Sequence, residues 1–324
     1  MIAVRRTALV ALVLAYVHTV FGAVVRISGS AMGCGDHWPD CNGSLIPSLT
    51  NRTLVIELTH RYSAVALLGV PTLVLMLVAI AHWRTPGIRG RGGVLRAALL
   101  AAALVIIAAL VGMALVVRGL TGGPAVALHY VIALATLAAL TSATQRAGGL
   151  GASGVESDGL APAKTYRGAL AAVILVLITV VFGSLTANIP GAAQSCQGFP
   201  WCREGMVSTG SVLFVQLTHR VLAFLVALHL LGFTIGSARR LDARPIIRAA
   251  QLALLIVVLQ LGAAAALVEL HLPPVLQSLH QALGTLLWVT TVSLAGLAKR
   301  AVAIQTAPIA LSGRSAVETA GAVA

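Results

Sequence analysis

The sequence predicts an all-α polytopic membrane protein, with eight transmembrane helices arranged as two pseudo-symmetric four-helix bundles. Three observations lead to this fold class. The 324 residues are 58% hydrophobic and only 10% charged, with a mean hydropathy of +0.96. Eight apolar runs are each long enough to cross a bilayer, which takes about 20 residues. Landmark residues of the first half recur in the second half at a nearly constant spacing.

The apolar runs are continuous rather than alternating, which excludes an outer-membrane β-barrel. The first run follows the short basic segment Met1–Arg6 without a small-residue cleavage site, so we expect a retained helix rather than a removed signal peptide. No Arg/Ser-rich extension precedes it, which argues against a mitochondrial precursor. The eight runs lie near residues 7–27, 54–82, 96–117, 125–145, 166–187, 212–238, 247–268 and 275–298.

Basic residues are concentrated in alternate connections between the runs. Lys and Arg mark the cytoplasmic side of a membrane protein, so both termini are predicted to lie in the cytoplasm, at a bacterial plasma membrane. The same distribution accounts for the net charge of +13 without nucleic-acid binding. The basic residues of the cytoplasmic connections are Arg84, Arg89, Arg91, Arg146, Lys164, Arg239, Arg240 and Arg244.

The chain divides into four segments. Residues 1–146 form an N-terminal four-helix half and residues 166–300 a C-terminal four-helix half. Between them, residues 147–165 are rich in Gly, Ser and Ala, which is typical of a flexible cytoplasmic linker. Residues 301–324 lack a periodic apolar face, so we expect a disordered tail.

The two halves form an internal repeat. The run ELTHR at Glu57–Arg61 returns as QLTHR at Gln216–Arg220, 159 residues later, and His129 and His280 are 151 residues apart. The two outer-loop cysteine pairs recur at spacings of 162 and 161 residues. Each half holds an even number of spans, so the repeats are expected to be parallel, about an axis along the membrane normal.

Four histidines are predicted at one depth of the membrane. His60, His129, His219 and His280 each lie about four to eight residues from the outer end of their helix, roughly 6–12 Å below the surface. Two histidines on different helices of one bundle can ligate a haem iron from both faces. The sequence thus offers two sites, His60 with His129 and His219 with His280. Lone hydrogen-bonded histidines, a zinc site and a copper site are the alternatives.

The other histidines and the outer arginines have weaker functional interpretations. For His18 and His229 we expect mid-helix packing, and for His82 an interface at a cytoplasmic helix end. His37 and His271, in outer loops, are expected to be solvated, with contact to a ligand as the alternative. Four arginines could pair with haem propionates or simply extend to the headgroups: Arg26, Arg61, Arg118 and Arg220.

The four cysteines lie in two outer loops. An oxidising compartment and one close pair per repeat favour the disulfides Cys34–Cys41 and Cys196–Cys202. Cross-loop pairing and metal binding remain alternatives, as does a redox role beside a purely structural one. The aromatic and proline content of the loops suggests lids over the sites below.

Glu57 distinguishes the halves, because Gln216 holds its place in the second half and cannot exchange a proton at neutral pH. The first half is therefore the better candidate for chemistry and the second for a fixed redox cofactor. The competing interpretation of Glu57 is a structural ion pair with Arg61 or Arg52. Glu269, at an outer helix end, needs no function.

Taken together, these motifs resemble the bacterial haem A synthase family. The resemblance covers about residues 1–300 and implies oxidation of a methyl group of haem O to the formyl group of haem A, for cytochrome oxidase. It implies that His219 and His280 hold haem b, that His60 and His129 handle the substrate haem, and that Glu57 takes part in the reaction. Haem O synthase and an electron acceptor are the implied protein partners, within membrane lipid.

Proteins of other classes share parts of this pattern. A non-catalytic diheme b-type electron-transfer protein would hold equivalent haems in both halves and would not need the difference between Glu57 and Gln216. A transporter with parallel repeats would need helices broken at mid-membrane. A haem carrier would be separated from an enzyme by assay of the product.

Overall fold

The computed structural model describes residues 1–48, 50–120, 122–158, 161–203 and 210–306. Eight of its helices are long and apolar enough to span a membrane, which confirms the predicted number of spans and the all-α class. The chain is therefore a multi-pass membrane protein. The spans are α1 (Ile2–Ile27), the composite second span described next, α4 (Val94–Val117), α5 (Gly123–Arg146), α7 (Ala163–Asn188), α8 (Ser211–Arg239), α9 (Arg244–Glu269) and α10 (Pro274–Thr306).

The second span consists of three helical segments in line. Its α2 (Arg52–Ser63) carries the ELTHR motif, a π-helical turn η1 (Ala64–Gly69) follows, and α3 (Val70–Ala81) completes the span. Asn51 caps the start of α2, because its side chain accepts the Thr53 N–H at 3.0 Å. Pro71 lies in the first turn of α3, directly after the π-helical turn, and a proline is tolerated at this position of a helix.

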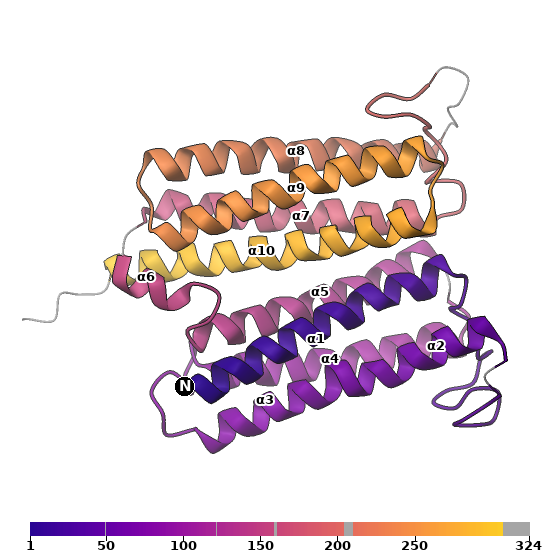
Figure 1. Cartoon of the computed structure of the whole chain (residues 1–324), viewed down its shortest axis with the longest axis horizontal. Helices are drawn as coiled ribbons and strands as arrows, with labels where there is room; N and C mark the ends of the chain where they lie inside the picture. Colours follow the sequence, from indigo (N-terminus) through magenta and orange to yellow (C-terminus); the bar gives the residue numbers. More distant parts are fainter. Residues whose placement is uncertain (49, 121, 159–160, 204–209, 307–324) are drawn as a thin grey trace, which may run out of the picture.

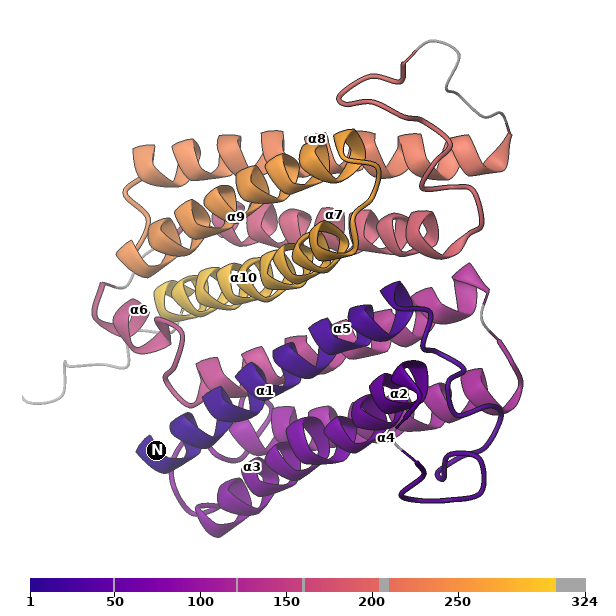
Figure 2. The same cartoon turned by 45° about the vertical axis from the view of Figure 1, so that its right-hand side comes forward.

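Each half of the chain forms a ring of four helices (Figures 1 and 2). In the first half α1 contacts α3 and α5, and α4 contacts the same two helices; in the second half α7 contacts α8 and α10, and α9 contacts the same two. The order of neighbours is the one that the sequence repeat predicts. The exact pseudo-symmetry of the two bundles stays a prediction.

The halves pack together through α1 and α5 on one side and α7 and α10 on the other. One buried apolar cluster runs across this contact and includes Leu134, Val176 and Trp288. Several hydrogen bonds cross it. Trp288 Nε1 donates to Leu134 O at 2.8 Å, Gln145 Nε2 to Ser293 O at 2.8 Å and Tyr16 Oη to Ala282 O at 3.1 Å. Hydrogen bonds inside an apolar interface fix its register.

Two predictions about the ends of the halves need correction. The predicted flexible linker contains a short helix, α6 (Ala152–Asp158), which contacts α9 and α10 because Ala152 and Val155 are fully buried. The predicted disordered tail begins too early, since α10 continues to Thr306 and Ala301 is buried in the same cluster as Val155. The remainder of that prediction, for residues 307–324, lies outside the described residues.

The substitution Gly296→Ala is expected to weaken the contact between the halves. A Cβ atom at Gly296 would overlap Oε1 of Gln145, so the amide would have to move and give up its bonds to Ser293. We expect a loss of about 1–3 kcal/mol in the free energy of unfolding, measured as a lower thermal midpoint in detergent. Gly262→Ala is the control, because nothing lies within 4 Å of the Cβ it would add. Equal midpoints for the two variants would contradict the packing described here.

Candidate functional site

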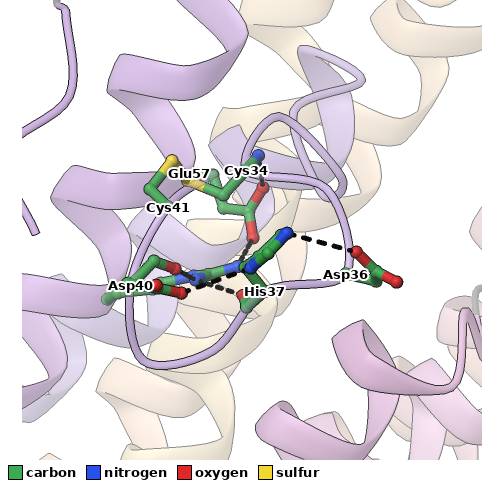
Figure 3. A network of polar contacts seen from close by, with 7 residues as sticks. Cys34, Asp36, His37, Asp40, Cys41 and Glu57 are labelled. Carbon is green, nitrogen blue, oxygen red and sulfur yellow. Dashed lines mark hydrogen bonds and ion pairs between the residues drawn. A yellow bond between two sulfur atoms is a disulfide. The ribbon is translucent and has the colours of Figure 1, made fainter. Parts of the chain in front are cut away.

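The Glu57 carboxylate ties the first outer loop to α2. Glu57 is buried, its Oε2 accepts the backbone N–H of Cys34 at 2.8 Å, and its Oε1 pairs with Arg61. Figure 3 shows the carboxylate beside Cys34 and the Cys34–Cys41 disulfide. Of the two predicted interpretations, the ion pair with Arg61 is therefore present. Neither carboxylate oxygen is hydrogen-bonded to His60.

Arg61 extends the same attachment further along the loop. Its Nη1 donates to the carbonyl oxygens of His37 at 2.8 Å and Asp40 at 2.6 Å. The His37 ring lies between the carboxylates of Asp36 and Asp40, at 3.9 and 3.7 Å, and is half exposed (Figure 3). His37 is thus a solvated loop residue, as expected, and one arginine secures the loop through its backbone.

The second half attaches its loop with uncharged groups at the equivalent position. Gln216 accepts from Ser195 Oγ at 2.7 Å and donates to Ala193 O at 3.0 Å and to Cys196 O at 3.3 Å. Arg220 repeats the part of Arg61, because its Nη2 donates to Cys196 O at 2.6 Å and its Nη1 to Gly198 O at 2.8 Å. Both copies of the motif therefore connect a cysteine loop to its helix.

Both predicted disulfides are present, Cys34–Cys41 and Cys196–Cys202, each within its own loop. A second attachment holds the Cys196–Cys202 loop. Glu269, at the end of α9, accepts the Phe199 N–H at 2.9 Å and pairs with Arg203. The expectation that Glu269 needs no function was therefore wrong in one respect: it fixes this loop at the outer end of the second bundle.

The histidine pair of the second half meets inside the bundle. The ring centres of His219 and His280 lie 6.4 Å apart and nearly perpendicular. His219 Nδ1 lies 3.0 Å from the carbonyl oxygen of Thr179. Because a carbonyl oxygen only accepts, Nδ1 carries the proton and Nε2 presents a lone pair. Metal-ligating histidines are oriented in this way.

The same pair fits a haem iron. Bonds of about 2 Å from a metal to an imidazole nitrogen on each side would put the ring centres about 6 Å apart. On the other side of the site, His280 Nδ1 and Gln260 Oε1 are buried without a hydrogen-bond partner in the described part of the chain. Buried polar atoms left without partners indicate a group that the protein is built to receive.

A cavity of about 700 Å³ surrounds His219 and His280, within the size range of cofactor sites. Gly183 allows close approach, since a Cβ atom there would lie 2.8 Å from His219 Cε1. The predicted ligand contacts Arg220 and His271 line it. So do Arg26 and Tyr130, which belong to the first half, so both halves build this cavity.

The first-half histidines come together differently. The His60 ring packs against Phe21, with ring centres 5.8 Å apart, while the His129 ring on α5 lies beside Gly112 of α4. His129 Nδ1 is buried and has no hydrogen-bond partner among the described residues. A third imidazole, His18, stacks on His60 with ring centres 4.6 Å apart. His18 thus packs within its helix bundle, as expected, and the ring against which it packs is that of a predicted iron ligand.

The remaining candidates lie away from both histidine pairs. His229 Nε2 bonds to Gly168 O at 2.9 Å and His82 Nδ1 to Val78 O at 2.9 Å, as expected for structural histidines. Arg118 is exposed at the end of α4. The sequence contained one signal for His18. Val20-Phe21-Gly22 recurs as Val181-Phe182-Gly183, so His18 aligns with Thr179 in the repeat.

A membrane bundle with paired imidazoles, a cavity of cofactor size and loops closed by disulfides defines a class of integral membrane protein with room for a ligand between its helices. Comparison with known proteins narrows this class. The family model for cytochrome oxidase assembly protein, COX15-CtaA, matches residues 5–292. The chain belongs to this family.

Several relatives carry the name heme A synthase. The relative from Bacillus licheniformis is 29% identical over 221 residues, which cover 68% of this chain and 70% of the relative. The relative from Shouchella clausii is 29% identical over 252 residues, covering 76% and 80%. The relative from Geobacillus kaustophilus is 29% identical over 259 residues and covers 78% of each chain.

The substitution Glu269→Ala is expected to loosen the second outer loop. It removes both the acceptor for the Phe199 N–H and the partner of Arg203. Loss of a hydrogen bond to a charged group, worth about 1.5–3 kcal/mol, should raise the hydrogen-exchange rate of the Phe199 amide by at least about tenfold. The Cys34 amide, bonded to Glu57, serves as the internal reference and should not change. An unchanged Phe199 rate would show that Glu269 does not hold the loop.

Proposed function

We propose that this protein is a haem A synthase, which oxidises a methyl group of haem O to the formyl group of haem A. The observation that carries the proposal is the match to the cytochrome oxidase assembly family over residues 5–292. Relatives named heme A synthase support it. The rival interpretation, a non-catalytic diheme protein, is supported by no relative and does not account for the difference between Glu57 and Gln216.

The second half is proposed to hold haem b between His219 and His280. The ring-centre separation of 6.4 Å and the lone pair left on His219 Nε2 support this assignment, and the Gln260 amide, 3.2 Å from His280 Nε2, would give up that nitrogen to the iron. Arg26 and Arg220 line the same cavity and can balance propionate charge, and the Arg26 side chain makes no hydrogen bond or ion pair with another described residue. When bound, haem b supplies one-electron redox capacity.

The first half is proposed to bind the substrate haem O through His60 and His129. Holding the substrate by its iron fixes the position of its methyl edge, which lowers the entropic part of the barrier. Packing of His60 against Phe21 and His18 keeps the imidazole in place before the substrate arrives. The first half thereby positions the substrate, while the second half remains a permanent electron acceptor.

Glu57 is proposed to hold or relay a proton beside the first-half site. It is the buried carboxylate of the motif, and Gln216 at the equivalent place in the second half cannot exchange a proton. Because Glu57 also bonds to Cys34 and Arg61, a change in its protonation would be felt by the outer loop. The proton role and the attachment of the loop therefore belong to one residue.

The proposed location is a bacterial plasma membrane, with both termini in the cytoplasm. The basic connections support this orientation, and Figure 1 places the N-terminus and α6 at the opposite end of the molecule from the cysteine loops. The disulfides then lie in the oxidising compartment. Haem O synthase and an electron acceptor are the proposed partners.

The proposed function is tested on the purified protein supplied with haem O. Its reduced absorption spectrum is recorded, and its pigments are extracted and separated before and after incubation. Appearance of haem A at the expense of haem O supports the proposal. Protein that carries resident haem b but converts no haem O with any one-electron acceptor would instead be the electron-transfer protein.

The substitutions His219→Ala and His280→Ala are each expected to remove the resident haem, because a bis-histidine iron loses one of its two protein ligands. Bound haem b should fall by at least about tenfold, measured as the reduced-minus-oxidised absorbance per protein. His82→Ala is the matched control, since the ring of this histidine, at a helix end, bonds to Val78 O and to no other described residue. Full haem content in both site variants would overturn the assignment.

The substitution Glu57→Gln is expected to leave the resident haem spectrum intact and to abolish conversion of haem O. The amide preserves size and the acceptor for Cys34, but it cannot exchange a proton. A loss of about 10²–10⁴-fold in rate is the range for a general acid–base group, measured by pigment extraction at fixed times. Wild-type activity in this variant would refute the proton role.

A further inference from the structure

His18 is a buried histidine of the first half whose surroundings differ from those of an ordinary packed side chain. It lies in the middle of α1, with 8% of its surface exposed. Its ring stacks on that of His60, at 4.6 Å between centres and 18° between planes. His129, on α5, is the third imidazole inside this bundle, and its buried Nδ1 has no hydrogen-bond partner among the described residues.

The hydrogen bonds around His18 determine which of its nitrogens carries the proton. Ser63 Oγ lies 2.9 Å from the carbonyl oxygen of His60 and 3.0 Å from His18 Nδ1. The hydroxyl has one hydrogen, and the carbonyl can only accept, so Ser63 donates to His60 O and accepts from His18. Nδ1 of His18 is therefore protonated, and the ring is held at the end of α2.

His60 itself is held without a hydrogen bond to its ring. Among the described residues, neither of its nitrogens has a hydrogen-bond partner, whereas His219 Nδ1 donates to the Thr179 carbonyl. The stack on His18, the contact with Phe21 and the open face of Gly22 surround the His60 ring. The orientation of the predicted iron ligand thus depends on another side chain rather than on the backbone.

The internal repeat shows that the two halves hold the motif histidine with different groups. Gly22 and Gly183 each lie against the motif histidine of their half, and they are 183 − 22 = 161 residues apart. The same spacing aligns His18 with Thr179, since 179 − 18 = 161. His18 is therefore the counterpart of Thr179, the residue whose backbone carbonyl orients His219 in the second half.

The residue that holds His18 changes together with it. The motif spacing is 219 − 60 = 159 residues, which aligns Ser63 with Leu222. The second half thus lacks both the imidazole and the hydroxyl. Because His18 and Ser63 occur together in the first half and neither has an equivalent in the second, we infer that the pair serves the first site alone.

We propose that His18, held by Ser63, is a positioning residue of the first-half site that orients His60 for the iron of the substrate haem. The proposal rests on the proposed function. A ligand held by hydrogen bonding to a carbonyl is fixed in one tautomer and suits a permanent cofactor. A ligand held by ring stacking keeps both nitrogens free of protein partners, which suits a porphyrin that must bind and then leave as product.

The test uses the purified protein with its resident haem b, titrated with ferric haem O. His18→Leu removes the stacked ring and is expected to weaken haem O binding by about 10–100-fold, the range for groups that orient a metal ligand. The electron paramagnetic resonance spectrum of low-spin ferric haem depends on the relative orientation of the axial imidazoles. The first-half signal should therefore shift, while the resident signal stays unchanged.

Two further variants separate positioning from general packing. Ser63→Ala keeps the His18 ring on His60 but removes its hydrogen bond to the hydroxyl. This variant should shift the same signal with a smaller loss of affinity. His18→Phe restores a ring against His60 and should recover most of the binding that His18→Leu loses. His82→Leu, a histidine of the same half at the far helix end, is the control and should change neither signal.

The outcomes distinguish this proposal from the function on which it rests. If wild-type protein neither binds nor converts haem O, the proposed function fails. If wild-type protein does so, and His18→Leu and Ser63→Ala bind haem O with unchanged affinity and signal, the role of His18 is overturned. Should His18→Leu lose the resident haem through misfolding, the Ser63→Ala result decides.

Discussion

The interior of an apolar bundle offers no water, so each nitrogen of a buried imidazole needs a partner in the protein or in a ligand. This requirement governs the centre of the molecule. In the second half, one nitrogen of His219 is satisfied by the Thr179 carbonyl and Nε2 of His280 by the Gln260 amide at 3.2 Å, and both residues line a cavity of about 700 Å³. Glycines on the neighbouring helices leave room beside the rings. The arrangement of the bundle interior therefore depends on the partner that each imidazole nitrogen finds.

The five-residue motif joins this interior to the outer surface. Residues four apart lie on one side of a helix. Glu57 and Arg61 therefore both hydrogen-bond to the backbone of the first loop, and Gln216 and Arg220 to that of the second. The histidine within each motif instead packs against another imidazole inside the bundle: His60 against His18, and His219 against His280. One short segment thus fixes the position of a proposed iron ligand and the position of the loop above it. Movement of either loop is coupled to the helix that carries this histidine.

The eight spans, the two disulfides and the pairing of His219 with His280 could be predicted, because span length, compartment and repeat spacing are properties of the chain itself. The stack of His18 on His60 could not, since it depends on how α1 crosses α2 and on a hydroxyl at Ser63. The attachment of the second loop by Glu269 likewise joins residues 70 positions apart. The helix α6 was missed because its small residues resemble a linker until Val155 is seen to be buried against its neighbours.

The residue differences between the halves share one property: each places a more adaptable polar group in the first half. Where the second half has Gln216, Thr179 and Leu222, the first has Glu57, His18 and Ser63, all within reach of the motif histidine or its loop. Each exchange adds a group that can ionise or change its hydrogen-bond partner. A cofactor that stays bound needs a ligand held in one state, and His219 is held in that way by a backbone carbonyl that no side-chain substitution removes. A substrate that enters and leaves needs a ligand site that can adjust, and side chains provide that adjustment. On the proposed function, these few exchanges between two copies of one bundle account for a cofactor site in one half and a reaction site in the other.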